Sequence, residues 1–215
     1  RWDWQPAVLV VIVLSLVIGA VTAITQSDIK RMLAYSSIAQ AGFMLIGVST
    51  GTVAGTASTI FYLISYGLVT IGAFAVVSII RNENGEANHL SNWAGLGRKS
   101  PLVAGVFTLF MLSLTGIPLT SGFIAKFGVF DSALEAGEVW IVIIAVIASI
   151  ISAFFYMRVV VLMFFSEPNE QTASVAIPSA LTTIALAAAA TVTLVLGIVP
   201  QPLLQLVADN ALFVR

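Results

Sequence analysis

Six apolar segments dominate this sequence, and each is long enough to cross the hydrocarbon core of a membrane. A helix needs about 20 residues to span about 30 Å of hydrocarbon. Of all residues, 59% are hydrophobic and only 9% are charged, whereas about one quarter are charged in soluble domains. The pattern predicts an all-α polytopic membrane protein. The predicted transmembrane helices cover approximately Pro6–Thr25, Ile29–Val48, Ala57–Ile80, Pro101–Phe130, Val139–Phe165 and Ala176–Val199.

The fourth segment, Pro101–Phe130, is too long for one straight span and carries helix-breaking residues in its middle. Gly116, Pro118 and Gly122 lie within seven residues of one another. A proline in a membrane helix frees backbone groups that lipid cannot satisfy. One interpretation is a simple bend. The other, which we favour, is a discontinuous helix like those at the binding sites of transporters.

Lys126 lies in the same segment, among almost entirely apolar neighbours. A charge at mid-membrane depth costs several kcal/mol, about 2.5–3.5 on insertion scales, and usually marks an ion pathway. Desolvation favours the neutral amine and a nearby carboxylate would favour the charged form, so Lys126 is a candidate proton relay. The alternative is a lysine that snorkels to the exterior headgroups, because Asp131 follows closely.

Polar side chains at helical spacing mark a second candidate region. Ser36, Ser37 and Gln40 form a patch in the second predicted helix, and Tyr66 belongs to a polar stripe in the third. These residues are candidates for lining a water-filled path. They also suit ordinary contacts between membrane helices, where small and polar side chains are expected. Further hydroxyls follow the same spacing, namely Ser58, Tyr62, Ser65 and Thr70 in the third helix and Ser149, Ser152 and Tyr156 in the fifth.

The connections are polar and mostly short, so we expect residues 1–215 to form one transmembrane helical bundle. Lysine and arginine mark the cytoplasmic side of membrane proteins. Here Lys30, Arg31, Arg81, Arg98 and Lys99 fall on one side, with Arg158 nearer to it, and the acidic residues Asp131, Glu135 and Glu138 fall on the other. This predicts that both chain ends, Arg1 and Arg215, face the exterior or periplasm. The start at Arg1, without methionine or a signal peptide, indicates a piece of a longer polypeptide.

The composition also excludes several function classes. The formal net charge is −1, which argues against nucleic-acid binding. The sequence has no cysteine, so thiolate metal sites and iron–sulfur ligation are excluded. One histidine, His89, cannot form a metal site alone. The six spans contain no aspartate or glutamate, so an acidic partner for Lys126 would have to come from elsewhere.

Several motifs resemble a known family. They are TQSDIKRMLAYSSIAQAGFMLIG (Thr25–Gly47), FYLISYGLVTIGAFAVV (Phe61–Val77), LSNWAGLGRKSPLVAG (Leu90–Gly105) and MLSLTGIPLTSGFIAKF (Met111–Phe127). The combination is similar to the antiporter-like membrane subunits of respiratory complex I, in particular the bacterial subunit N type, and covers nearly the whole chain. The GIP…GF…K pattern alone also occurs in Mrp-type sodium/proton antiporter subunits.

The resemblance implies a fold of fourteen transmembrane helices, of which this chain looks like the ninth to the fourteenth. Pro101–Phe130 then corresponds to the broken twelfth helix, and Lys126 to its lysine in a line of charged residues along the membrane midplane. The family's key glutamate on the fifth helix and lysines on the seventh and eighth would precede Arg1. Gln40 falls where many relatives carry histidine, so we expect it to hold water rather than to carry charge.

The expected function is that of a proton-translocating membrane subunit of NADH-quinone oxidoreductase, in the bacterial inner (plasma) membrane. No cofactor is expected in this chain, and the resemblance places flavin, iron–sulfur clusters and quinone in partner subunits. Its expected partners are the neighbouring antiporter-like and small membrane subunits and the lipid bilayer. Two alternatives are a subunit of an Mrp-type sodium/proton antiporter and a purely structural membrane subunit.

Overall fold

The fold begins with three long antiparallel helices. In the computed structural model, which describes residues 4–83 and 85–210, α1 covers Gln5–Ile24, α2 covers Ile29–Ser49 and α3 covers Val53–Ile79. The predicted chain-end residues Arg1 and Arg215 lie outside the described ranges. Helix α3 starts four residues earlier than predicted, because the Thr52 hydroxyl accepts a hydrogen bond from the Gly55 N–H at 3.0 Å and caps the helix there.

The fourth crossing is made of two half-helices. Helix α5 covers Pro101–Thr115 and α6 covers Ser121–Glu135, with 15 residues each. At 1.5 Å per residue, each half is about 22 Å long, which is too short to cross the hydrocarbon alone. The discontinuity predicted in this segment is therefore present, and α7 (Val139–Phe165) then returns as one continuous helix.

The last part of the chain differs from the predicted single helix. Helix α8 covers Ala180–Ile198 and α9 covers Gln201–Asn210. The Ser179 hydroxyl caps α8 by accepting from the Thr182 N–H at 3.2 Å, so the helix starts later than predicted. The helix ends shortly before Pro200, and α9 begins at once, because a proline such as Pro202 is tolerated in the first turn of a helix.

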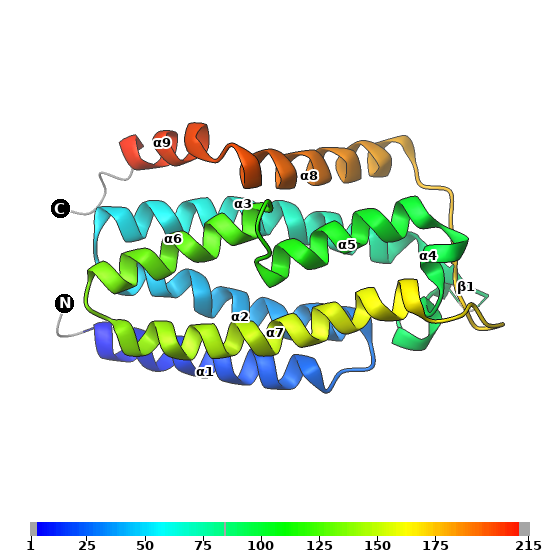
Figure 1. Cartoon of the computed structure of the whole chain (residues 1–215), viewed down its shortest axis with the longest axis horizontal. Helices are drawn as coiled ribbons and strands as arrows, with labels where there is room; N and C mark the ends of the chain where they lie inside the picture. Colours follow the sequence, from blue (N-terminus) through cyan, green and yellow to red (C-terminus); the bar gives the residue numbers. More distant parts are fainter. Residues whose placement is uncertain (1–3, 84, 211–215) are drawn as a thin grey trace.

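The helices pack into an elongated bundle with α8 and α9 along one edge and α1 and α7 along the opposite one (Figure 1). Helix α1 packs against α2 and α7, while α3 contacts α2, α6 and α8. In the described part of the chain, five continuous helices are long and apolar enough to span a membrane, namely α1, α2, α3, α7 and α8. The fourth predicted segment is occupied by α5 and α6, neither of which is among these five.

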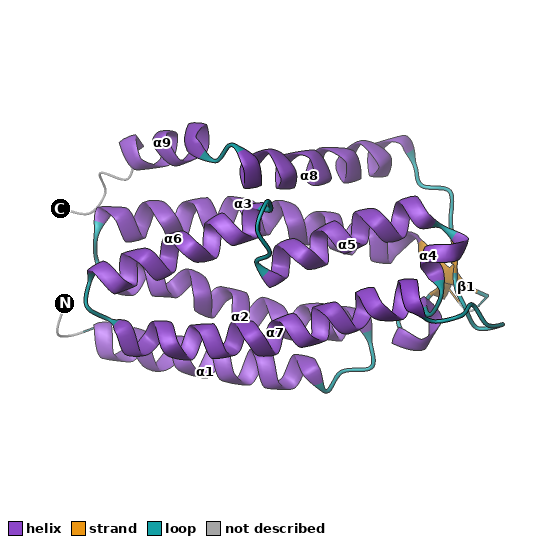
Figure 2. Ribbon diagram, in the orientation of Figure 1, coloured by secondary structure: helices purple, strands orange, loops and turns teal. Residues whose placement is uncertain are grey.

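One end of the bundle carries the non-helical structure (Figure 2). Strands β1 (Ile80–Asn82), β2 (Gly85–Glu86) and β3 (Ser174–Val175) form a small antiparallel sheet in the order β2-β1-β3. A 3-10 turn at Leu90–Trp93 and the short α4 (Leu96–Lys99) complete this polar cap. The all-α prediction missed the sheet, because each strand is only two or three residues long and lies in a polar connection.

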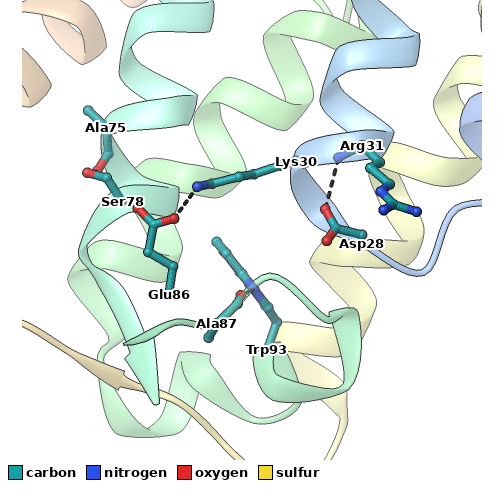
Figure 3. Close-up of polar contacts among 8 residues, drawn as sticks. All are labelled: Asp28, Lys30, Arg31, Ala75, Ser78, Glu86, Ala87 and Trp93. Carbon is teal, nitrogen blue, oxygen red and sulfur yellow. Dashed lines mark hydrogen bonds and ion pairs between the residues drawn. The ribbon is translucent and has the colours of Figure 1, made fainter. Parts of the chain in front are cut away.

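The polar cap is fastened to the first turn of α2, as Figure 3 shows. The Lys30 ammonium pairs with the Glu86 carboxylate. Asp28 caps α2 by accepting from the Arg31 N–H at 2.9 Å. Trp93 is fully buried and donates its indole N–H to the Ala87 carbonyl at 2.8 Å. The Lys30–Glu86 pair therefore fastens the loop between α3 and α5 to the start of α2, and the Trp93 bond braces the loop itself.

The basic residues at the ends of the described helices lie at the end with the sheet, where acidic residues accompany them. At the end with the sheet, the Lys99 ammonium donates to the Thr172 carbonyl at 2.8 Å and Arg98 lies 3.8 Å from Glu167. At the other end, the Glu138 carboxylate accepts from Gln5 at 2.7 Å and from Ser49 at 3.1 Å. Glu138 thereby joins α7 to α1 and α2 where the acidic residues gather. Arg158 is exposed along α7.

Candidate functional site

The helix break begins with a left-handed residue after α5. Gly116 has φ +90°, a conformation in which a side chain costs about 1–2 kcal/mol. The N–H groups of Gly116 and Ile117 both lie 3.0 Å from the Leu112 carbonyl and complete the last turn. The chain then passes through Pro118 and Leu119, which also has positive φ, at 71°. Residues 116–120 therefore separate two well-terminated half-helices.

The start of α6 lies directly against the end of α5. The Gly122 N–H donates to the Ser113 hydroxyl at 3.1 Å. A Cβ atom at Gly122 would collide with the Ser113 carbonyl, so only glycine permits this close approach. Helix α8 packs closely against the segment between α5 and α6, since a Cβ atom at Gly197 would meet the backbone of Leu119 and Thr120. Of the predicted break residues, Gly116 and Pro118 lie in the connecting segment and Gly122 in the first turn of α6.

Lys126 points into the bundle from the second turn of α6. Its exposed fraction is 5%. The amine donates to the Thr115 carbonyl at 2.9 Å and to the Ser149 hydroxyl at 3.0 Å. It also lies 4.6 Å from the centre of the Phe43 ring, within cation–π range. The amine therefore faces the interior and contacts α5, α7 and α2, rather than reaching outward along the helix.

The surroundings of Lys126 suit an ammonium group without a carboxylate. Thr115 is the last residue of α5, and the C-terminal end of a helix carries partial negative charge that favours a cation. An ammonium has three N–H donors, and here a carbonyl, a hydroxyl and a ring face are available to accept them. Among the described residues, no aspartate or glutamate forms an ion pair with Lys126.

Gln40 lies buried on the other side of the same helix end. Its amide N–H₂ group donates to the Leu114 carbonyl at 3.1 Å and to the Tyr156 hydroxyl at 3.3 Å. Its amide oxygen accepts from the Tyr62 hydroxyl at 2.5 Å. Gln40 thus bonds to the carbonyl of Leu114, and Lys126 bonds to the carbonyl of the next residue, Thr115. The two side chains, far apart in the sequence, meet at the last two residues of α5.

The remaining candidates lie nearer the polar cap. The Tyr66 hydroxyl donates to the Ser37 hydroxyl at 2.7 Å, so α2 and α3 are joined there. The Ser37 hydroxyl itself donates to the Leu33 carbonyl at 2.9 Å, and Ser36 donates to the same carbonyl at 2.7 Å. Ser37 and Tyr66 therefore form a pair between helices, and the Ser36 hydroxyl also contacts the Tyr156 hydroxyl of α7.

A small cavity lies between these groups and the break. Its volume is about 10 Å³ and its lining includes Gln40, Tyr66, Ser113 and Gly122, which is about the smallest space that holds one water molecule. Ser65 also lines the cavity and is buried, and its hydroxyl has no hydrogen-bond partner among the described residues. A buried hydroxyl without a partner is costly, so this cavity is suited to a water molecule.

The sequence indicated Lys126 and Gln40 as candidate site residues, but it did not predict which side chains contact them. Tyr62, Tyr156 and Ser149 were recognised only as members of polar stripes, and nothing marked Phe43. Within each stripe, the spacing of three or four residues indicates that the side chains share one face of a helix. It does not indicate which residue of another helix packs against that face. No group of three or more histidine, aspartate or glutamate residues lies together within the described ranges.

Comparison with known proteins places the chain in a family. The model of the NADH:quinone oxidoreductase/Mrp antiporter transmembrane family matches residues 1–152, which include the break and Lys126. NADH-quinone oxidoreductase subunit N from Rhodococcus opacus is 55% identical over the full chain, and that from Salinispora arenicola is 54% identical. The chain spans only 40% and 42% of the length of these relatives.

Solved structures show the same fold. Respiratory complex I from Thermus thermophilus matches with a TM-score of 0.81 and 33% identity, over 93% of this chain and 45% of the other. The Mrp complex from Dietzia sp. matches with a TM-score of 0.86 and 26% identity, over 99% of this chain and 47% of the other. The resemblance found in the motifs is thus confirmed, and the chain belongs to the NADH:quinone oxidoreductase/Mrp antiporter transmembrane family.

Proposed function

We propose that residues 1–215 form one transmembrane bundle, the carboxy-terminal part of a proton-translocating subunit of NADH-quinone oxidoreductase. The support is the 55% identity to a protein named as subunit N of that enzyme, together with a lysine amine buried at a helix break. Electron transfer from NADH to quinone takes place in partner subunits, which hold the flavin, the iron–sulfur clusters and the quinone. This chain holds none of them and moves protons.

In this proposal the Lys126 amine is the relay. It receives a proton from the interior of the bundle and releases it toward the acidic end. Ser37, Tyr66 and the cavity beside Gln40 form the approach from the polar cap. Gln40 has no proton to exchange at physiological pH, so it orients water and the end of α5. Ser36 lies beside this route as a weaker participant.

The proposed location is the bacterial inner membrane. The polar cap with Lys30, Arg81 and Lys99 faces the cytoplasm, in agreement with the positive-inside rule, and the end with Glu138 faces the exterior, as do both chain ends. The proposed partners are the neighbouring antiporter-like and small membrane subunits. The exposed apolar faces of α1 and α8 are suited to lipid or to such subunits.

Two substitutions of Lys126 in the complete enzyme test the relay. Lys126→Ala removes the amine, and Lys126→Arg keeps a positive charge that does not deprotonate in proteins. Both are expected to lower proton pumping, measured in inverted membrane vesicles together with quinone-linked NADH oxidation. Lys99→Ala at the cytoplasmic end is the matched control. Undiminished pumping by an assembled Lys126→Ala enzyme would reject the relay.

A second candidate is a subunit of an Mrp-type sodium/proton antiporter. The observation in its favour is the high TM-score to the Mrp complex from Dietzia sp.. The two functions are separated by what accompanies the chain and what drives it. Sodium-dependent proton exchange without NADH supports the antiporter, whereas co-purification with flavin and iron–sulfur subunits supports the oxidoreductase.

A purely structural subunit is the remaining alternative. It would tolerate Lys126→Leu without any change in pumping.

A further inference from the structure

We propose that Ser149 is the positioning residue for the relay amine, and that it holds the amine in place in both protonation states. Its hydroxyl accepts a hydrogen bond from the charged ammonium and donates one to the neutral amine. This inference rests on the proposed relay function of Lys126 and adds a residue on α7 to it.

The argument starts from the chemistry of the three groups around the amine. The Thr115 carbonyl and the Phe43 ring face can only accept. A hydroxyl carries one proton and two lone pairs, so it both donates and accepts. When Lys126 is neutral, its nitrogen has a lone pair that needs a donor. Among the groups that contact the amine in the described structure, Ser149 alone can provide one.

The Ser149 hydroxyl is free to turn between the two roles. In the part of the chain described here, its contact with the Lys126 amine at 3.0 Å is its only hydrogen bond. Ser152, on the same helix, behaves differently, because its hydroxyl donates to the Ala148 carbonyl at 2.8 Å. The Ser152 hydroxyl is thus occupied by its own helix, as serine hydroxyls in helices can be, whereas the Ser149 hydroxyl is not.

The depth of Ser149 fits the role. It lies ten residues after Val139, the first residue of α7, which corresponds to about 15 Å along the helix axis and so to about half of a 30 Å hydrocarbon core. At that depth water does not readily replace a lost partner.

The proton transfer balances without any other group. The ammonium gives its proton to water on the outward side, and Ser149 keeps its own proton while its O–H turns toward the nitrogen.

The test uses the complete enzyme with three variants. Ser149→Ala removes the hydroxyl, Ser149→Thr retains it, and Ser152→Ala is the matched control on the same helix. Proton pumping and NADH oxidation are measured in inverted vesicles. Loss of a hydrogen bond to a charged group corresponds to roughly a tenfold change in rate, so Ser149→Ala is expected to pump about tenfold more slowly. Ser149→Thr and Ser152→Ala are expected to pump at rates near that of the parent enzyme.

Each result decides between the proposals. If Lys126→Ala is defective while Ser149→Ala pumps like Ser152→Ala, the role of Ser149 is overturned and the relay stands. If Lys126→Ala also pumps normally, the relay itself falls. Should Ser149→Ala not assemble, Ser149→Cys replaces it, because a thiol keeps the volume but bonds weakly; normal pumping by this variant overturns the inference. Failure of both to assemble, with Ser149→Thr intact, assigns the hydroxyl to folding and overturns it as well.

Discussion

The Lys126 amine lies 2.9 Å from the Thr115 carbonyl oxygen, so a side chain of one half-helix closes the last turn of the other. The hydrogen bond spans 11 residues and crosses the whole break. A buried amine and the exposed carbonyls of a helix end are each costly in a membrane. Placed together, the amine supplies a donor to the carbonyl, and the carbonyl supplies an acceptor to the amine. The break is therefore the reason that a lysine is tolerated here without a carboxylate.

Gly116→Ala is predicted to disturb the break. The left-handed backbone at φ +90° disfavours alanine by about 1–2 kcal/mol, and the new Cβ atom would lie 3.0 Å from Cδ of Lys126. We expect a lower thermal midpoint of the purified enzyme and slower pumping. Gly105→Ala in α5 is the control, since no atom lies within 4 Å of its new Cβ. Equal stability and pumping of the two variants would contradict the prediction.

Gln40→Leu is predicted to destabilise the bundle. It leaves the Leu114 carbonyl and the Tyr62 hydroxyl without this partner, while Tyr156 keeps its bond with Ser36, and each unsatisfied buried group costs about 1–3 kcal/mol. Thermal unfolding in detergent measures the loss. Gln40→His offers one donor and one acceptor and is expected to restore part of it. Gln26→Leu is the control, because Gln26 is only partly buried and bonds to the Thr22 carbonyl. A loss no larger than in Gln26→Leu counts against the assignment.

The contact between Lys30 and Glu86 is predicted to depend on pH. The hydrogen bond and charge of Lys30 hold the pKa of Glu86 below its ordinary value of 4.5. A lowered folded-state pKa stabilises the fold above the unfolded pKa, and that stabilisation is lost as pH falls through the folded value. We therefore expect docking of the loop between α3 and α5 to weaken below about pH 4.5, and also at high salt.

Proteolysis of this loop in inverted vesicles measures the effect. Glu86→Gln is expected to be cleaved faster at neutral pH and to lose the pH dependence. Glu83→Gln is the control, because Glu83 is exposed in the same loop and forms no ion pair among the described residues. Identical cleavage of the two variants at all pH values would show that the ion pair does not fasten the loop.

Trp93→Ala is predicted to be the most damaging substitution in the polar cap. Trp93 is fully buried, bonds to the Ala87 carbonyl and lies 4.8 Å from Phe107 between ring centres. Truncation of a buried tryptophan costs about 3–5 kcal/mol. Trp140→Ala, at an exposed position on α7, is expected to change stability by only about 0.5 kcal/mol. Thermal unfolding of both variants in detergent compares them, and similar midpoints would refute a packing role.

The long apolar helices and the break in the fourth segment follow from the sequence because they depend on local properties. Runs of apolar residues favour membrane helices, and Gly116 and Pro118 disfavour a continuous helix through their own backbone chemistry. The small sheet and the restart of the helix at Gln201 did not follow. Short strands form only when distant segments such as β1 and β3 meet, and a proline stops one helix as readily as it begins another.

What the sequence by itself indicated was therefore a helical membrane protein with a lysine beside a gap in its fourth apolar segment. The tertiary structure decided which groups meet that lysine and Gln40. Their hydrogen-bond partners lie 11, 22, 23, 74 and 116 residues away along the chain. Hydrophobicity and helix breaking act over a few residues, whereas hydrogen-bond partners depend on how whole helices pack, and one sequence pattern is compatible with many such packings.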